Sequence, residues 1–388
     1  MNRSEHTPPR PDPDPTGTGG SLRGARLTDL RIMSTSEGLT HGVLDRETIA
    51  ATDPTDQLTD ILALPEHLRD ALWKTESAAL GTWDSPGGLV VAGMGASAIG
   101  GTVAAAALGD HASRPILLAR AYGLPPWTTP DTTVLCASYS GETEETLACF
   151  EAAGALGARR VVVTTGGTLA EQARAESVPV IPVAGGLRSA TAAGYMVVAA
   201  LETAAACGAG PRLTSELDVA AEHLEELVIE WGPEGAEDGE LKTLARALEG
   251  TVPMVAGAGL TSVIAHRWKA QLNRQARMPS WATELPDADH YEIAGWEGAE
   301  EVGRFAAVFL DDCDTHPRVQ SRMALTRDII SARAAGTYVI SSRGTTAVER
   351  ALSLVLAGDL LSLYLAVLRG VDPAGESDVC RLKDALAG

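Results

Sequence analysis

Two short segments of this chain place small hydroxyl residues and glycines directly after apolar runs. Both segments lead into helix-like sequence, where a helix N-terminus would offer unpaired N–H groups and partial positive charge. Hydroxyls add hydrogen-bond donors without charge, and glycine lets the backbone approach a ligand closely. The pattern therefore predicts a binding site for an anion of the phosphate type. Its candidate ligand contacts are Gly95, Ala96, Ser97, Ser138, Ser140 and Thr143.

Other interpretations of these segments are open. Serine or threonine followed by glutamate is also ordinary helix-capping chemistry. A dinucleotide-binding unit would need an acid about 20 residues after its glycines, closing the next strand, whereas the run RPILLAR ends in Arg120. Ser97 lacks the G-x-S-x-G elbow of a hydrolase. Two such loops at neighbouring strand ends favour the phosphate site.

Short β-rich runs alternate with helical patterns along most of the chain. The runs GGLVVAGMG, RPILLAR, TTVLCAS, ARRVVVTT and VPVIPVA are followed, after helical sequence, by TVPMVAGAG, FAAVFLDD and GTYVISSRG. Such alternation predicts parallel sheets with helices on both faces. Residues 87–206 and 249–370 read as weak duplicates. The predicted fold class is α/β, with two doubly wound parallel-sheet subdomains.

The expected organisation has three parts. Residues 1–42 are rich in Pro, Gly and Asp and are predicted to be a disordered tail. Residues 43–210 would hold N-terminal helices and the first subdomain. Residues 211–388 would hold a linker helix, the second subdomain and a C-terminal helix.

Composition limits the classes of partner. The 388 residues carry a net charge of −20, which argues against nonspecific binding to nucleic acid or an anionic membrane. Five cysteines without C-x-x-C spacing indicate reduced thiols and a cytoplasmic location. The most apolar stretch, 351–370, holds Asp359 near its middle, so we expect a buried helix there and not a membrane span.

Taken together, several segments resemble a known family. GMGASAIGG, SYSGETEET, VVVTTGGTLAEQA and GLRSATAAGY look like the sugar isomerase (SIS) domain. Over 43–385 their order and spacing resemble the bifunctional phosphoglucose/phosphomannose isomerase family. The resemblance implies two SIS-type subdomains, conversion of glucose 6-phosphate or mannose 6-phosphate to fructose 6-phosphate, and no metal or other cofactor. It also implies a homodimer whose active site lies at the subunit interface and is completed by the partner's histidine.

The resemblance also implies roles for individual residues. The hydroxyl loop 138–143 would hold the substrate phosphate, with Gly95 and Ser97 against the sugar. Arg188 would stabilise negative charge on the enediol, His290 would open the sugar ring, and Lys383 would approach from the C-terminal helix.

The chain departs from this family at the proton-abstracting base. The family reads roughly Asn-Glu-Asn-Ala-Lys there, with its glutamate sixteen residues before the histidine, whereas 273–277 read Asn-Arg-Gln-Ala-Arg and Arg274 takes that place. Arginine stays protonated and cannot act as a general base.

Three outcomes of this change are open. In the first, another acid takes over as the base. In the second, the chain is a diverged enzyme acting on another phosphosugar, with Arg274 meeting a second anionic group. In the third, the chain binds phosphosugars without catalysis. The candidate replacement acids are Glu284, Asp287, Asp289 and Glu292.

Overall fold

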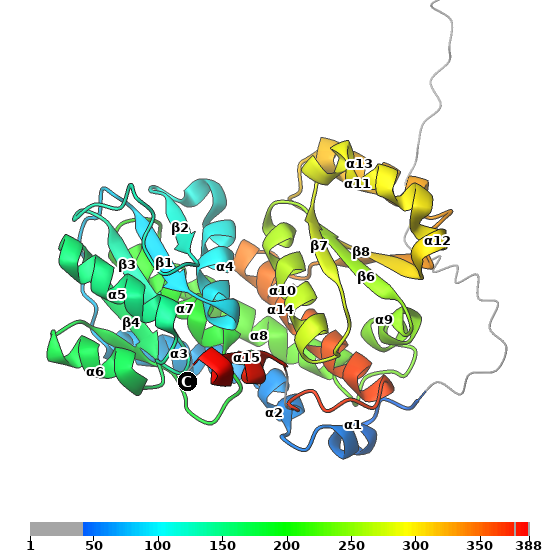
Figure 1. Cartoon of the computed structure of the whole chain (residues 1–388), viewed down its shortest axis with the longest axis horizontal. Coiled ribbons are helices and arrows are strands. Elements are labelled where there is room, and N and C mark those ends of the chain that lie inside the picture. The colour runs from blue at the N-terminus through cyan, green and yellow to red at the C-terminus, as the bar shows by residue number, and fades with distance from the viewer. Residues whose placement is uncertain (1–41, 376–377, 387–388) are drawn as a thin grey trace, which may run out of the picture. The chain divides into compact units, whose positions relative to one another are not determined.

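Two separate parallel sheets organise the chain. The computed structural model describes residues 42–375 and 378–386 (Figure 1). Of the predicted tail, residues 1–41 lie outside the described residues. The first sheet has five strands in the order β2-β1-β3-β4-β5, namely β1 (Leu89–Gly93), β2 (Ile116–Ala119), β3 (Thr133–Ala137), β4 (Arg159–Thr164) and β5 (Val180–Pro182). The second has four in the order β7-β6-β8-β9, namely β6 (Val252–Gly257), β7 (Trp281–Glu284), β8 (Phe305–Asp311) and β9 (Gly336–Ser341).

The two sheets share one topology. In each, the first strand pairs with the second on one side and with the third on the other, and the fourth pairs with the third. The predicted duplication and the predicted fold class are therefore confirmed. The short strand β7 is not among the predicted strands. It is an edge strand with only Thr283 buried, so it lacks the apolar run that marks the central strands.

Helices cover both faces of each sheet. The longer ones are α1 (Arg46–Thr52), α2 (Gln57–Leu62), α3 (Leu64–Ser77), α4 (Ile99–Leu108), α5 (Glu144–Leu156), α6 (Gly167–Ala175), α7 (Ala193–Ala206), α8 (Thr214–Trp231), α9 (Glu240–Leu248), α10 (Leu260–Arg274), α13 (Pro317–Ile330), α14 (Ala347–Leu368) and α15 (Asp378–Leu386). Single-turn elements are η1 (Gly95–Ala98), η2 (Gly109–His111), η3 (Asp287–His290), α11 (Glu292–Gly295), η4 (Trp296–Gly298) and α12 (Ala299–Val302).

Alternate strand residues point into different cores. Val91 of β1 and Val255 of β6 face one large core, shared by both sheets with α4, α7, α10 and α14. Val90 faces a second core under α5 and α6, and Met254 a third under α13. Both faces of each sheet are therefore buried, as the apolar runs predicted. Because α8 packs on α3 and also on α14, the boundary at 210/211 stays a prediction.

The predicted buried helix is α14, which runs through the centre of the large core. It is long and apolar enough to cross a membrane, yet 94% of its most apolar window is buried inside the protein. Its position is that of a core helix (Figure 1). Gly358 allows close packing against α10, since a side chain at that position would overlap the Trp268 ring.

A buried ion pair joins α10 to α14. Arg267 lies 2.6 Å from Asp359, and both side chains are more than nine-tenths buried. Gln271 donates to the other Asp359 oxygen at 2.8 Å. Arg267 also donates to the backbone carbonyl of Ala190 at 2.9 Å, in the segment before α7. One cluster of charge thus connects helices of the second half of the chain to a loop of the first half.

We predict that Gly100→Ala destabilises the fold. A Cβ at Gly100 would overlap the carbonyl oxygen of Met196, where α4 crosses α7. The helices would have to separate, which we expect to lower the free energy of unfolding by roughly 1–3 kcal/mol. Gly123→Ala is the matched control, because a Cβ there meets nothing within 4 Å. Denaturant unfolding measures both variants, and equal midpoints would contradict the packing described.

We further predict that Asp359→Leu lowers the free energy of unfolding by more than removal of both charges does. The single change leaves Arg267 buried without its counter-ion, which typically costs about 3–5 kcal/mol. The double variant Arg267→Met/Asp359→Leu should recover most of that loss, since a packed apolar pair replaces the ions. Unfolding free energies from a double-mutant cycle test this prediction, and additive losses would argue against a coupled pair.

Candidate functional site

The two predicted loops lie side by side at the carboxyl edge of the first sheet. β1 and β3 are neighbours, with Gly93 opposite Ala137 in register. The loop after β1 continues into η1 and α4, and the loop after β3 continues into α5. Strand order reverses at this point, and such a switch point is where open parallel sheets bind ligands.

The 138–143 loop is held together by its own hydroxyls. Ser138, which is buried, lies 2.9 Å from Thr143 between hydroxyl oxygens and accepts from the N–H of Gly141 at 3.1 Å. The Ser140 hydroxyl accepts from the Glu142 N–H at 3.2 Å and is exposed. Gly141 has φ +74°, and a Cβ there would overlap the carbonyl oxygen of Gly166. The loop is thus preformed, with hydroxyls gathered at its centre.

These hydroxyls do not serve as the cap of α5. Thr143 occupies the N-cap position, but no side chain accepts a cap hydrogen bond there. In the first turn, the buried Thr146 hydroxyl has no hydrogen-bond partner among the described residues. An uncapped helix N-terminus retains donors and partial positive charge for an anion. The geometry favours the anion site over simple capping.

Ser97 joins the first loop to the second. Its buried hydroxyl accepts from the backbone N–H of Tyr139 at 3.1 Å. The adjacent residues Gly95, with φ +52°, and Ala96 are exposed and half-buried, respectively. The structure therefore brings all six predicted contact residues to one edge of the first sheet.

Tyr139 extends this connection to a third segment, 183–192. Its phenol donates to the carbonyl of Ala184 at 3.3 Å. Burial raises the pKa of the Tyr139 phenol, opposed by a hydrogen bond from the Leu187 backbone. Arg188 follows directly and is exposed, and its side chain makes no hydrogen bond or ion pair with other described residues. Thr191 fixes the Arg188 carbonyl from the next turn, at 2.9 Å.

Arg274 reaches the same segment from the second half of the chain. It is the last residue of α10, is exposed, and donates to the Ser189 hydroxyl at 3.1 Å. Seven residues earlier on the same helix, Arg267 holds the Ala190 carbonyl. The arginine that stands in the expected base position thus bonds the residue that follows Arg188.

The remaining predicted residues are placed elsewhere or lie outside the description. His290 is exposed at the end of η3, which packs on β7 and α11 within the second half. The backbone of Lys383 lies in α15, but the prediction for its side chain falls outside the described residues. Their predicted roles stay predictions.

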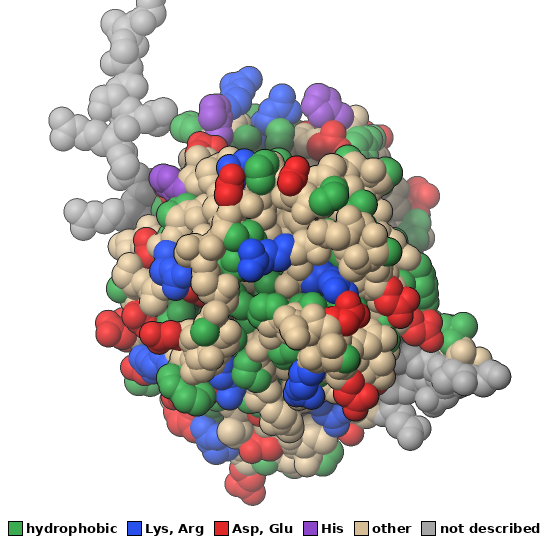
Figure 2. Space-filling view, turned by 90° about the vertical axis from the view of Figure 1, so that its left-hand side faces the viewer, with side chains coloured by type: hydrophobic (Ala, Val, Ile, Leu, Met, Phe, Trp, Pro, Cys, Tyr) green, Lys and Arg blue, Asp and Glu red, His purple; other side chains and the backbone are tan. Residues whose placement is uncertain are grey.

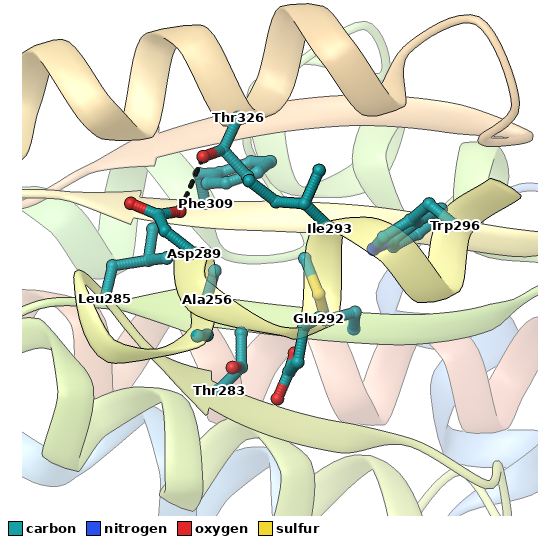
Figure 3. Close-up of a pocket in the computed structure, with 11 residues that line it drawn as sticks. Ala256, Thr283, Leu285, Asp289, Glu292, Ile293, Trp296, Phe309 and Thr326 are labelled. Carbon is teal, nitrogen blue, oxygen red and sulfur yellow. Dashed lines mark hydrogen bonds between the residues drawn. The ribbon is translucent and has the colours of Figure 1, made fainter. Parts of the chain in front are cut away.

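Of the four candidate replacement acids, Asp289 has a clear structural partner. It accepts from the Thr326 hydroxyl at 2.7 Å, beside a cavity of about 10 Å³ on one face of the second sheet (Figure 3). That volume is about the room one water needs. Asp287 accepts from the Tyr291 phenol at 2.8 Å and is exposed. All four acids belong to the segment 284–292 around His290.

The equivalent edge of the second sheet is closed by the protein's own groups. Beyond β8, Asp312 is buried and lies 2.8 Å from Arg350, which also pairs with Asp314. Beyond β6, the buried Thr261 hydroxyl accepts from the Ala258 N–H at 2.9 Å. No group of three or more His, Cys, Asp or Glu among the described residues is arranged to hold a metal ion. The switch point lined by hydroxyls is the one in the first sheet.

Charge is mixed on one face of the first half of the chain. On the face seen from the side of α5 and α6, Lys and Arg lie interspersed with Asp and Glu, without a broad field of one sign (Figure 2). An anion would therefore be attracted by the loops and by nearby guanidinium groups, as the acidic composition indicates.

Tyr139 and Ser189 are absent from the predicted site residues. Tyr139 stands between Ser138 and Ser140, and its backbone N–H and phenol make the contacts that join three segments. Ser189 directly follows Arg188, and this adjacency is the sequence feature that could have indicated Ser189 as a site residue.

Comparison with known proteins agrees with this architecture. Residues 237–386 match the family described as bacterial phospho-glucose isomerase C-terminal SIS domain. A glucose-6-phosphate isomerase like protein from Thermus thermophilus has a similar fold, with a TM-score of 0.58 and 22% identity over 88% of this chain and 99% of that chain.

Two relatives at higher identity carry the same name, bifunctional phosphoglucose/phosphomannose isomerase. That of Caldicellulosiruptor bescii is 34% identical, covering 77% of this chain and 89% of the relative. That of Aquifex aeolicus is 33% identical, covering 77% of this chain and 90% of the relative. Identity of this extent, on the fold and loops described above, shows that the chain belongs to the bifunctional phosphoglucose/phosphomannose isomerase family.

Proposed function

We propose that this chain binds a phosphorylated sugar at the switch point of its first sheet and acts in aldose–ketose isomerisation. The observation that carries the proposal is the hydroxyl loop 138–143, held against Ser97 at the uncapped N-terminus of α5. The relatives named above are isomerases of glucose 6-phosphate and mannose 6-phosphate type by name. In this assignment the loop holds the phosphate, while Gly95 and Ser97 line the sugar.

Isomerisation moves a proton between C1 and C2 through an enediol. It needs a group that opens the ring, a base at carbon and a cation for the oxyanion. We assign the cation to Arg188, which is exposed in the segment that the Tyr139 phenol joins to the phosphate loop. We assign ring opening to His290. Because η3 packs within the second half of the chain, we propose that His290 acts in a partner's site and that the working unit is a homodimer.

The ordinary reaction should be slow in this chain. Arg274 stands where the resemblance expects the base, and a positioned base typically contributes about 10²–10⁴-fold. We place the protein in the cytoplasm, a location supported by the free thiols of Cys136, Cys149, Cys207 and Cys313. The domain boundaries at 42/43 and 210/211 belong to the same proposal.

We predict that Ser140→Ala and Thr143→Val weaken binding of fructose 6-phosphate. Each removes a hydroxyl that would bond a phosphate oxygen, and the expected loss is about tenfold or more. Calorimetric titration measures the dissociation constants. Ser77→Ala is the control, because its exposed hydroxyl bonds only the Trp73 carbonyl one turn earlier. Wild-type affinity in all three variants would remove the basis of the proposed site.

We predict that Arg274→Glu raises isomerase turnover. A carboxylate at this position, next to Ser189, would restore a proton acceptor at carbon. The increase should reach about 10²-fold or more in a coupled assay with fructose 6-phosphate. Exchange of the C1 proton in D₂O reports enolisation even where no net product forms. Lack of exchange in Arg274→Glu, despite binding of fructose 6-phosphate, would show that position 274 does not face the reacting carbon.

A further inference from the structure

The loop 138–143 contains an acidic residue, Glu142, that bonds the start of the next helix along the chain. One carboxylate oxygen accepts from the Thr168 backbone N–H at 2.8 Å, and the other accepts from the Thr168 hydroxyl at 2.8 Å. Thr168 is the second residue of α6, and the N-cap residue of that helix, Gly166, has no side chain to cap it. Glu142 therefore caps α6 from a loop that lies 26 residues earlier in the sequence.

The backbone of the loop also lies against the start of α6. The Leu169 N–H donates to the Gly141 carbonyl at 3.0 Å. The approach is close at Gly167, which has φ +70°, because a Cβ there would overlap the Glu142 carboxylate and the Ser140 carbonyl oxygen. Three consecutive residues of the loop are thus in contact with the first turn of α6.

The two helices that follow β3 and β4 therefore begin differently. A helix N-terminus favours a negative group, and at α6 the Glu142 carboxylate supplies it. At α5, which follows β3, no side chain accepts a cap hydrogen bond, and the hydroxyls of Ser138 and Thr143 lie 2.9 Å apart. The acid of the loop is directed at α6, while the hydroxyls of the loop remain at α5.

The charge of Glu142 and its contacts have opposite consequences for an anionic ligand. Hydrogen bonds from Thr168, chiefly from its backbone N–H, lower the pKa of the Glu142 carboxyl, so the group is ionised at neutral pH. A negative charge in the loop would by itself oppose the binding of a phosphate. The same charge strengthens the bonds that hold the loop, because charge-assisted hydrogen bonds are stronger than neutral ones. The two effects predict changes of opposite sign when Glu142 is replaced.

We propose that Glu142 is a positioning residue for the phosphosugar site, whose bonds to Thr168 hold the loop in the conformation that binds the phosphate. This inference rests on the proposed function, because it takes the hydroxyls of Ser140 and Thr143 to bond the phosphate. Glu142 acts through the loop and touches no ligand atom in this assignment. Its removal should weaken the binding of an anion even though it removes a negative charge.

Calorimetric titration of the full chain with fructose 6-phosphate tests the sign of this effect. Glu142→Ala should raise the dissociation constant roughly tenfold or more, since it removes both bonds to Thr168. Glu142→Asp keeps the charge but shortens the side chain by one methylene, so it should also weaken binding. Glu142→Gln keeps the length and can still accept from the Thr168 N–H, so it should bind more tightly than the other two variants.

Two controls separate positioning from charge and from helix stability. Glu144→Gln also removes a negative charge at the start of α5, but the Glu144 carboxylate bonds the exposed Tyr122 phenol at 3.0 Å and not α6. Its affinity for fructose 6-phosphate should equal or exceed that of the wild type. Ala170→Gly weakens α6 and leaves the Glu142 and Thr168 side chains in place, so thermal stability should fall while affinity stays within about twofold.

The failures of the two proposals are distinguishable. If fructose 6-phosphate does not bind the wild-type chain, the proposed function fails and the positioning role fails with it. If it binds the wild type, and Glu142→Ala binds it equally or more tightly, the positioning role is refuted while the site stands. Equal losses of affinity in Glu142→Ala and Glu144→Gln would assign the effect to charge, and equal losses in Glu142→Ala and Ala170→Gly would assign it to the stability of α6. Either result would also refute the positioning role.

Discussion

The buried pair between Arg267 and Asp359 is the interaction on which the site depends. Two charges removed from water are tolerated only when each has partners, and here Gln271 and the Ala190 carbonyl complete the set. The carbonyl belongs to the segment that carries Arg188. A charge cluster inside the core thereby fixes the backbone from which a surface arginine projects, and it does so from helices of the other half of the chain.

The two sheets share one topology, yet their switch points differ in side-chain chemistry. At the second switch point, Asp312 and Arg350 neutralise one another, and the Thr261 hydroxyl accepts from the Ala258 N–H of its own loop. At the first, serine and threonine hydroxyls bond one another around an uncapped helix. An incoming anion can exchange those neutral contacts for charge-assisted ones, which are stronger. The two equivalent edges therefore differ in their side chains: an ion pair lies at the second and a group of hydroxyls at the first.

Much of this was accessible from the sequence, because strand periodicity and loop composition are local signals. Apolar runs identified the central strands, and the strand-end glycines and hydroxyls identified the loop residues. Strand β7 was not predicted because an edge strand with one buried residue has no apolar run. Tyr139 was not predicted as a site residue because it acts through its backbone N–H and its phenol. The partners of these two groups lie 42 and 45 residues away in the sequence. The fold decides which residues meet across such sequence separations, so no local sequence pattern predicts these contacts.

The electrostatics of position 274 limit the chemistry that the site can perform. In the proposed assignment, the guanidinium that bonds the Ser189 hydroxyl adds to the stabilisation of negative charge that develops there, including that of an enediolate. It accepts no proton, so it stabilises the product of deprotonation without driving the step that forms it. That limit follows from the identity of one side chain and from the hydrogen bond that places it at Ser189.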